Sequence, residues 1–301
     1  MTIVIIGYGT QGKKRHSVLK KKKKKILIVD PIYIHANAKK IEDIKEYYSH
    51  AFICTPDNIK LKIISYLLEK NIKILVEKPL YLKKKADYKS IVNLLKKYRK
   101  SQIYVAYNHR FEPNIQRLKK YISKEKIGNI FLIEMYYGNG TSKLWQQSNW
   151  RRNDNKGVVL DLGVHLLDIY LYLFGKMPNK NVFFINSKNE NKNIDYAVFG
   201  SVKNNLILKF TTSLIDWKNK FEINIIGEKG SIHVNNLCKW GDSIFTYRKR
   251  KLPSGIPVEK VIIEKKGDPT WSKEHKYFFN SNKISNYNND LEIKKYIDNI
   301  F

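Results

Sequence analysis

The sequence predicts an α/β fold: an N-terminal Rossmann domain with a parallel sheet, followed by a C-terminal α+β domain with an open, mainly antiparallel sheet. Three observations predict it. A run of β-branched residues opens the chain and leads at once into a glycine-rich turn. Strand-like and helix-like segments then alternate as far as residue 107, which is typical of βαβ units. Beyond that point strand-like segments recur without crossover helices, which favours antiparallel pairing.

The first expected strand, residues 3–6, ends in a glycine motif. Gly7, Gly9 and Gly12 have the spacing G-x-G-x-x-G. In a dinucleotide-binding fold the first glycine allows the tight turn, the second leaves room for a pyrophosphate, and the third lets the next helix pack closely. The N-terminus of that helix offers free N–H groups to the phosphates. The residues expected to bind the cofactor here are Gly7, Tyr8, Gly9, Thr10, Gln11 and Gly12.

A second expected strand, residues 26–29, ends in an acidic residue. Asp30 lies 18 residues after Gly12, where a dinucleotide fold places a carboxylate for the adenosine ribose hydroxyls. Because a carboxylate repels a 2′-phosphate, we expect NAD as the cofactor. NADP is the alternative, since the lysine run 20–25 could weaken the preference. A glycine-rich turn in some other α/β protein is the competing interpretation of the motif.

The rest of the first third continues the same alternation. We expect strands at 51–54, 72–76 and 103–107, and helices near 36–48, 61–69 and 85–100. Two of these strands end in Thr55-Pro56 and Glu77-Lys78-Pro79. Since ligands of such sheets lie outside the carboxyl ends of the strands, these residues are expected at one edge.

The remainder of the chain has a different pattern. After a helix-like stretch at 115–122, strands are expected at 130–137, 181–186, 196–202, 206–212, 221–226 and 231–234, and a loop at 280–289. We therefore predict a dinucleotide-binding domain at residues 1–118 and a second domain at 119–301, to which the family resemblance described below assigns substrate binding and oligomerisation.

A polar stripe follows the expected helix 160–174. Asp161, His165, Asp168 and Tyr172 share one face of a helix that is otherwise apolar. Because unpaired buried carboxylates are costly, the stripe is expected to face water or a site. A histidine with a carboxylate one turn away can act as a general base. A structural Asp–His pair is the alternative.

The bulk properties limit the classes of protein to which the chain can belong. A hydrophobic content of 43% is ordinary for a globular chain of 301 residues. No secretory signal precedes the first strand, and the longest apolar run, 158–174, is interrupted by three titratable residues. With only Cys54 and Cys238, a reduced cytoplasmic protein is the simplest interpretation. We expect no membrane partner.

The net charge of +30 requires an explanation. A basic nucleic-acid-binding protein is one interpretation. However, most of the 57 basic residues are lysines spread along the whole chain, whereas proteins that read bases and phosphates tend to use arginine. We therefore expect no nucleic-acid partner. The positive field could attract a phosphorylated substrate.

Taken together, these motifs resemble the glucose-fructose oxidoreductase/inositol dehydrogenase (Gfo/Idh/MocA) family over nearly the whole chain. The resemblance rests on the glycine loop 7–12, Thr55-Pro56, Glu77-Lys78-Pro79, Tyr107-Asn-His-Arg-Phe111 with Pro113, Asp161-Leu-Gly-Val-His165 with Asp168, and Gly227-Glu-Lys-Gly230. The chain departs from the family at Lys60, where a histidine is frequent, and at Asn155-Lys156-Gly157, where three glycines are frequent.

The resemblance implies an NAD(P)-dependent oxidoreductase that transfers a hydride between a nicotinamide cofactor and a sugar, cyclitol or sugar nucleotide. It implies Lys78 and His165 as catalytic residues supported by Asp161, and no metal. It implies homo-oligomers formed through the C-terminal sheet, and a cis peptide bond between Lys78 and Pro79. A sensor that binds the same ligands without turnover is the alternative function. The further residues implied to contact or line the cofactor site are Thr55, Pro56, Glu77, Lys78, Asn108 and Arg110; a surface ion pair is the alternative role of Arg110.

Overall fold

The structure is a computed structural model that describes residues 1–21, 23–80, 85–98, 102–145, 156–178, 182–265, 267–281 and 286–301. It divides into two compact units: unit 1 comprises Met1–Tyr107 and Trp271–Leu291, and unit 2 comprises Asn108–Thr270 and Glu292–Phe301. This division differs from the predicted one at 118/119. The boundary lies earlier in the chain, and a C-terminal segment that was expected in the second domain belongs to unit 1.

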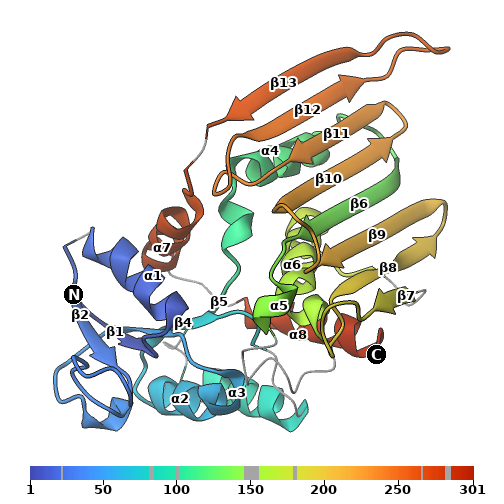
Figure 1. Cartoon of the computed structure of the whole chain (residues 1–301). Coiled ribbons are helices and arrows are strands. Elements are labelled where there is room, and N and C mark those ends of the chain that lie inside the picture. The colour runs from blue at the N-terminus through green and yellow to red at the C-terminus, as the bar shows by residue number, and fades with distance from the viewer. Residues whose placement is uncertain are drawn as a thin grey trace. The chain divides into compact units, whose positions relative to one another are not determined.

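Unit 1 is built on a five-stranded, fully parallel sheet with the order β2-β1-β3-β4-β5 (Figure 1). Each of the first four strands ends in a predicted motif, so these motifs share the carboxyl edge of the sheet, as a parallel arrangement requires. The Rossmann-type fold is confirmed. The elements are β1 (Thr2–Ile6), β2 (Lys25–Val29), β3 (His50–Ile53), β4 (Lys73–Glu77), β5 (Gln102–Ala106), α1 (Thr10–Lys20), α2 (Asp57–Glu69) and α3 (Lys85–Lys97).

The helix expected at 36–48 does not form. The segment between β2 and β3 contains a single 3-10 turn, η1 (Ile41–Asp43). Asn37 explains the difference, because its backbone N–H donates to the Ile28 carbonyl at 2.8 Å and its side-chain Oδ1 accepts from the Ile28 N–H at 2.8 Å. These bonds hold the start of the segment extended beside β2, and Ala38 forms a parallel bridge with Val29.

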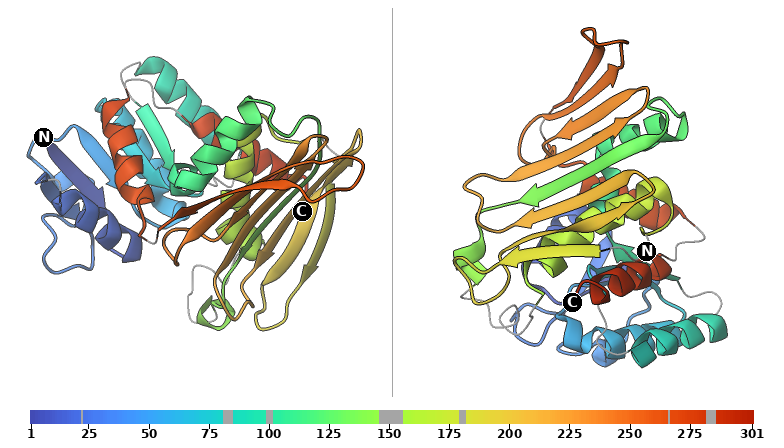
Figure 2. Two further views of the ribbon diagram at one scale, coloured as in Figure 1. Left: turned by 90° about the horizontal axis from the view of Figure 1, so that it is seen from above. Right: turned by 90° about the vertical axis from the view of Figure 1, so that its right-hand side faces the viewer.

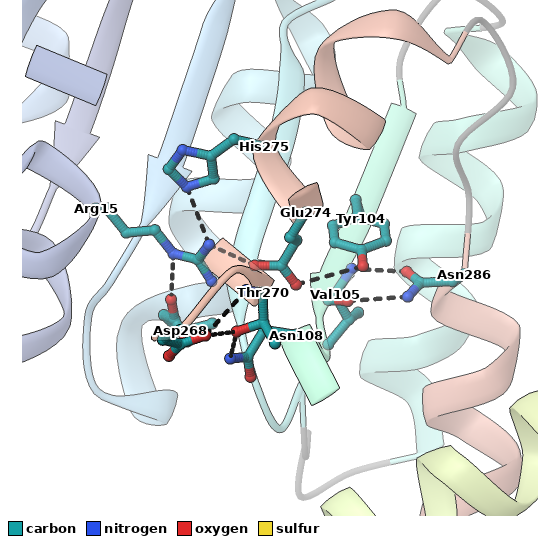
Figure 3. A network of polar contacts seen from close by, with 10 residues as sticks. Arg15, Tyr104, Val105, Asn108, Asp268, Thr270, Glu274, His275 and Asn286 are labelled. Carbon is teal, nitrogen blue, oxygen red and sulfur yellow. Dashed lines mark hydrogen bonds and ion pairs between the residues drawn. The ribbon is translucent and has the colours of Figure 1, made fainter. Parts of the chain in front are cut away.

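Two C-terminal helices, α7 (Thr270–Asn280) and α8 (Tyr287–Asp298), follow the last strand. Within unit 1, Phe278 of α7 packs edge-on against Phe52 of β3. Asn286, just before α8, pairs with the edge strand β5: its side chain accepts from Val105 N–H at 2.7 Å and donates to Val105 O at 2.9 Å (Figure 3). An amide side chain thus satisfies backbone groups that an edge strand leaves open. Of the loop expected at 280–289, residues 282–285 lie outside the described residues.

Unit 2 contains an eight-stranded sheet with the order β13-β12-β11-β10-β6-β9-β8-β7, antiparallel except for the β6–β9 pair. The mainly antiparallel second sheet is confirmed. Six of these strands match predicted segments. Residue 181, the first residue of the strand predicted at 181–186, lies outside the described residues. The sequence did not predict β12 and β13. The strands are β6 (Ile130–Gly138), β7 (Val182–Ser187), β8 (Tyr196–Lys203), β9 (Leu206–Ser213), β10 (Lys220–Gly227), β11 (Gly230–Asn235), β12 (Ser243–Lys249) and β13 (Val258–Glu264).

One face of this sheet carries the helices of unit 2. α4 (Pro113–Ser123) contacts β11 and β12, and α6 (Val164–Phe174) contacts β6. Phe199, Phe210 and Phe221 are fully buried. The opposite face, turned toward the viewer in the right-hand view of Figure 2, carries none of the described helices. Among the described residues, no helix is both long and apolar enough to cross a membrane.

Candidate active site

In the glycine loop after β1, the backbone geometry requires glycine at Gly7 and Gly12, whereas the space beside Gly9 is open. Gly7 has a φ of +89°, and an added Cβ would lie 2.7 Å from the carbonyl oxygen of Cys54. A Cβ on Gly12 would lie 2.1 Å from the carbonyl oxygen of Gly7, so α1 can approach the turn only with glycine there. Gly9 has an ordinary φ of −71°, and a Cβ there would meet none of the described atoms within 4 Å. Its small size therefore preserves space outside the protein backbone.

The start of α1 adds positive potential beside this space. Gly9 is the N-cap residue and offers no side-chain acceptor, and the first turn carries no acidic residue. The first N–H groups of a helix lack acceptors within the helix, and the helix dipole places partial positive charge there. The loop residues, with Tyr8, Thr10 and Gln11 among them, thus fit the pyrophosphate of a dinucleotide.

The carboxylate of Asp30, at the end of β2, binds the backbone of the glycine loop. One oxygen accepts from the N–H of Tyr8 at 2.7 Å, and the other accepts from the N–H groups of Ile32 and Tyr33, both at 2.9 Å. Burial raises the pKa of Asp30, but these three backbone donors outweigh burial and lower it below the usual value. Asp30 is therefore an anion held by the backbone at the position expected for a ribose contact.

Thr55 and Pro56 follow β3, next to the glycine loop. Thr55 Oγ1 is buried and has no hydrogen-bond partner among the described residues. Its Cγ2 lies 3.1 Å from the position of a Cβ on Gly7. An orphaned hydroxyl beside the loop fits a ligand that would supply the missing partner.

Lys60, one of the positions at which the sequence departs from the family pattern, binds the backbone at the end of β4. The ammonium of Lys60, buried on α2, donates to the carbonyl oxygens of Glu77 at 2.7 Å and Pro79 at 3.0 Å, and pairs with Asp57 at 2.6 Å. The Lys78–Pro79 peptide bond is cis, as predicted. Lys60 thus fixes the backbone on both sides of Lys78.

A buried ion network links α1, β4 and α7 within unit 1 (Figure 3). Arg15 Nε donates to Glu77 at 2.8 Å, and its Nη1 donates to Glu274, which also accepts from the Tyr104 hydroxyl at 3.3 Å. Burial raises the pKa of Glu274 to about 7, although Arg15 opposes the shift. No local sequence pattern indicates the contact of Arg15 with Glu274, because the two residues lie 259 positions apart.

In unit 2, the predicted helix at 160–174 begins with a π-helical turn, η3 (Val159–Gly163), and continues as α6. It ends as predicted at Gly175, which has a φ of +77°. His165 and Asp168 are buried rather than turned toward water. Asp168 binds both Nε, at 2.6 Å, and Nη2 of Arg110. The expectation that the stripe faces water or a site is therefore wrong for Asp168, which is neutralised inside unit 2.

His165 instead belongs to a cluster that sequence analysis did not foresee. Its Nδ1 lies 2.8 Å from Nδ1 of His109, on the 3-10 turn η2 (Asn108–Phe111). Nε2 of His109 lies 3.3 Å from Nζ of Lys239, which also donates to the Tyr137 hydroxyl at 3.0 Å. Burial lowers the pKa of Lys239 to about 8, and the charges of Asp268, Glu112 and Asp161 oppose the shift. Among the 57 basic residues of the chain, no sequence signal distinguishes this lysine.

The predicted residues are thus divided between the units. Lys78 and all predicted loop residues belong to unit 1, whereas Asp161, His165 and Asn108 belong to unit 2. Asn108 is buried and donates to Thr270 Oγ1 at 2.7 Å. Of the departures noted in the sequence, Asn155 lies outside the described residues, and Gly157 has a φ of +48°. No group of three or more possible metal ligands occurs among the described His, Cys, Asp and Glu residues.

The fold is that of a two-unit α/β protein with a Rossmann-type parallel sheet, and comparisons with known proteins show what it is similar to. Residues 115–233 match the GFO/IDH/MocA C-terminal domain. The match covers less than half of the chain.

Two solved structures share the fold. Levoglucosan dehydrogenase in complex with NADH has a TM-score of 0.84 at 16% identity, over 100% of this chain and 95% of that one. The WlbA dehydrogenase from Bordetella pertussis, in complex with NADH and UDP-GlcNAcA, has a TM-score of 0.67 at 15% identity, over 79% and 80%.

Among curated proteins, glucose-6-phosphate 3-dehydrogenase from Bacillus subtilis (strain 168) is 28% identical over 160 residues. The match covers 44% of this chain and 44% of that protein, so it spans less than half of the relative.

Proposed function

We propose that the chain is an NAD-dependent dehydrogenase acting on a sugar or a sugar derivative. The observation that carries the proposal is the open space at Gly9, bordered by the uncapped start of α1 and by the ionised Asp30. The enzymes named in the comparisons support it, since they are dehydrogenases, two of them bound to NADH.

The chemistry of the proposal assigns a role to each predicted catalytic residue. A nicotinamide cofactor, when bound, would supply hydride transfer to and from a carbinol carbon. His165 would take the hydroxyl proton through Nε2, because its Nδ1 is engaged with His109. Lys78 would stabilise the developing oxyanion as a compact ammonium, and Asp161 would support the charge on the histidine.

An anionic substrate fits this chain better than a neutral one. The net charge is +30, and a positive field raises the local concentration and association rate of anions. A glucose phosphate dehydrogenase and a protein in complex with UDP-GlcNAcA stand among its relatives and structural neighbours. We propose a sugar phosphate or sugar nucleotide as the substrate class.

Assembly through the second sheet is also part of the proposal. Exposed apolar side chains recur on the face that carries no described helix, across strands β7 to β13. An apolar surface of this kind favours self-association, and a cytoplasmic location fits the free thiols of Cys54 and Cys238. The exposed residues are Ile185, Val202, Ile207, Ile226, Ile244, Val261 and Ile263.

The test is a panel of neutral sugars, sugar phosphates and sugar nucleotides, assayed with NAD⁺ by the absorbance of reduced nicotinamide. We expect oxidation of at least one anionic sugar. Lys78→Arg should lose most of this turnover because a planar fork cannot replace a compact ammonium, whereas Lys62→Arg, an exposed change on α2, should keep it. Binding of NAD⁺ and sugar without turnover would instead support the sensor function.

A further inference from the structure

We propose that β13, the edge strand of the second sheet, pairs with β13 of a second copy of this chain in an antiparallel register centred on Ile262. This interface differs from the open face of the sheet, because strands pair through their edges and leave both faces uncovered. It needs neither cofactor nor substrate, so it stands or falls independently of the proposed function.

The edge of the sheet at β13 is available for pairing. β13 lies at one end of the strand order and hydrogen-bonds to β12 (Figure 1). The two strands pair without a register shift, from Ser243↔Glu264 to Lys249↔Val258. No strand among the described residues pairs with the other side of β13. The outward N–H and C=O groups of an uninterrupted edge strand are a template for another strand.

The side chains of β13 are also more exposed than apolar residues of a covered strand. Val258, Val261 and Ile263 are 71%, 52% and 50% exposed, respectively. Ile262, which points to the other face, is partly buried. A neighbouring strand would contact the flanks of these side chains and remove part of their apolar surface from water.

The order of the residues in β13 is complementary to itself when reversed. Residues 259–265 read Glu-Lys-Val-Ile-Ile-Glu-Lys. In an antiparallel pair with a two-fold axis at Ile262, each residue lies opposite the one equally far beyond Ile262 in the second copy. The opposed pairs are Glu259 with Lys265, Lys260 with Glu264, Val261 with Ile263, and Ile262 with itself. Every charge in this stretch therefore meets an opposite charge, and every apolar side chain meets an apolar one.

Neighbouring two-fold registers do not satisfy these charges. An axis at Val261 would place Lys260 opposite Ile262. An axis at Ile263 would place Glu264 opposite Ile262. Since opposite charges directly across a strand pair stabilise it and a charge facing an apolar side chain does not, the register centred on Ile262 is favoured. Charges on an edge strand otherwise guard against pairing, so their order here selects one partner and one register.

The same register keeps each side chain on a suitable face. Ile262 lies across from Phe245 of β12, whose ring packs against Tyr121 of α4, so Ile262 lies on the face that carries the helices. Val261 and Ile263 alternate with it and lie on the open face. Residues opposite each other in an antiparallel pair share a face. The apolar surface of the open face therefore continues across the two-fold axis.

The charged side chains of β13 keep groups that a second copy can bind. Oε1 of Glu264 binds Arg117 at 2.6 Å, and Oε1 of Glu259 binds Arg248. The second oxygen of each carboxylate can accept from a further cation. Lys260 is exposed and makes no ion pair with a described residue. The pairs within the chain are therefore compatible with the pairs between copies.

The first test is the molecular mass by light scattering between about 1 and about 100 μM protein, without ligands. One strand pair is a small interface, so we expect a dissociation constant on the order of 10 μM. Lys260→Glu places like charges opposite each other twice and should lower the mass of the wild-type assembly about twofold at the highest concentration. Lys62→Glu, the same change of charge at an exposed position of α2, should keep the mass. Equal masses for the wild type and Lys260→Glu overturn the proposal.

Two comparisons make this test specific to β13. Ile207→Glu, on the open face, should leave the twofold effect of Lys260→Glu in place, because the face and the edge are separate surfaces. Glu264→Lys also opposes like charges and should behave as Lys260→Glu does. An equimolar mixture of these two variants restores opposite charges at both pairs, so its mass should return to that of the wild type. A mixture of folded variants that keeps the lower mass overturns the proposal.

Cross-linking tests the register without a change of charge balance at the axis. Ile262→Cys places two thiols opposite each other, with Cα atoms about 4.5–5.5 Å apart, within reach of a disulfide. Glu259→Cys places its two thiols six residues apart along the strands, roughly 20 Å. Mild oxidation should yield a linked dimer of Ile262→Cys and leave Glu259→Cys and the wild type unlinked. Absence of the link in Ile262→Cys, or equal linking in Glu259→Cys, overturns the proposal, whether or not any sugar is oxidised.

Discussion

Asp168 and Arg110 face each other inside unit 2, with Nε of Arg110 2.6 Å from one carboxylate oxygen and Nη2 bonded to the other. Asp168 is 1% exposed. Burial raises its pKa, and Arg110 opposes this shift. Of the predicted polar stripe, Asp168 is therefore paired with Arg110 inside unit 2, whereas His165 contacts His109.

Removing one partner of this pair should destabilise the protein. Arg110→Met leaves a buried carboxylate without its counter-charge, which costs about 3–5 kcal/mol and should lower the thermal midpoint by roughly 10 °C. Lys295→Met, which breaks the exposed pair with Glu292, should change it little. Arg110→Met combined with Asp168→Leu should recover much of the loss. An Arg110→Met midpoint equal to that of the wild type would show that the pair is not structural.

Replacing His165 should affect turnover and leave cofactor binding intact. Loss of a general base costs on the order of 10²–10⁴ in rate, and the predicted dinucleotide residues other than Asn108 and Arg110 lie in unit 1. We expect His165→Ala to show this loss with an unchanged dissociation constant for NADH, and His50→Ala, at the amino end of β3, to keep its turnover. Full turnover in His165→Ala, in a variant shown to be folded by circular dichroism, would contradict the assignment.

The fold and the loop could be predicted because they depend on short local patterns. Glycine spacing, alternating strands and helices, and Gly175 at a helix end each act within a few residues. The ion network of Arg15, and Lys239 beside His109, depend on residues far apart in the chain, which no local pattern reveals. The helix predicted at 36–48 is absent for a similar reason: the hydrogen bonds of Asn37 with Ile28 of β2 outweigh the local helix propensity.

Asp30 should make the protein prefer NAD⁺ to NADP⁺. Its carboxylate is ionised at neutral pH, since three backbone N–H groups hold its pKa low, and it repels a 2′-phosphate. We expect NAD⁺ to bind at least about tenfold more tightly, and Asp30→Asn to narrow the difference. The measurement is a calorimetric titration with each cofactor. NADP⁺ binding as tight as NAD⁺ would contradict the prediction.

Glu274 should make the protein less stable as the pH rises, whereas most carboxylates have the opposite effect on stability. Its pKa is about 7 in the folded chain, against 4.5 for an unperturbed glutamate, so the folded state binds more protons between these pH values. The free energy of unfolding should therefore fall as the pH rises from 4.5 to 7, by at most about 3 kcal/mol from this group.

Thermal midpoints across this range give the test for Glu274. Glu274→Gln should flatten the decline, and Glu69→Gln, at an exposed position on α2, should not. An identical decline in Glu274→Gln and the wild type would show that Arg15 keeps Glu274 ionised throughout.

The central claim, that the loop after β1 holds a dinucleotide, is tested most directly by titrating NADH into the wild type, Gly9→Asp and Gly9→Asn. An added Cβ at Gly9 meets none of the described atoms within 4 Å, and Asp and Asn are favoured N-cap residues, so both variants should keep the wild-type thermal midpoint. Asp brings a negative charge into the space assigned to the pyrophosphate, and Asn brings the same volume without charge. We predict that NADH binding is lost in Gly9→Asp and weakened in Gly9→Asn. Wild-type affinity in a folded Gly9→Asp variant would contradict the claim.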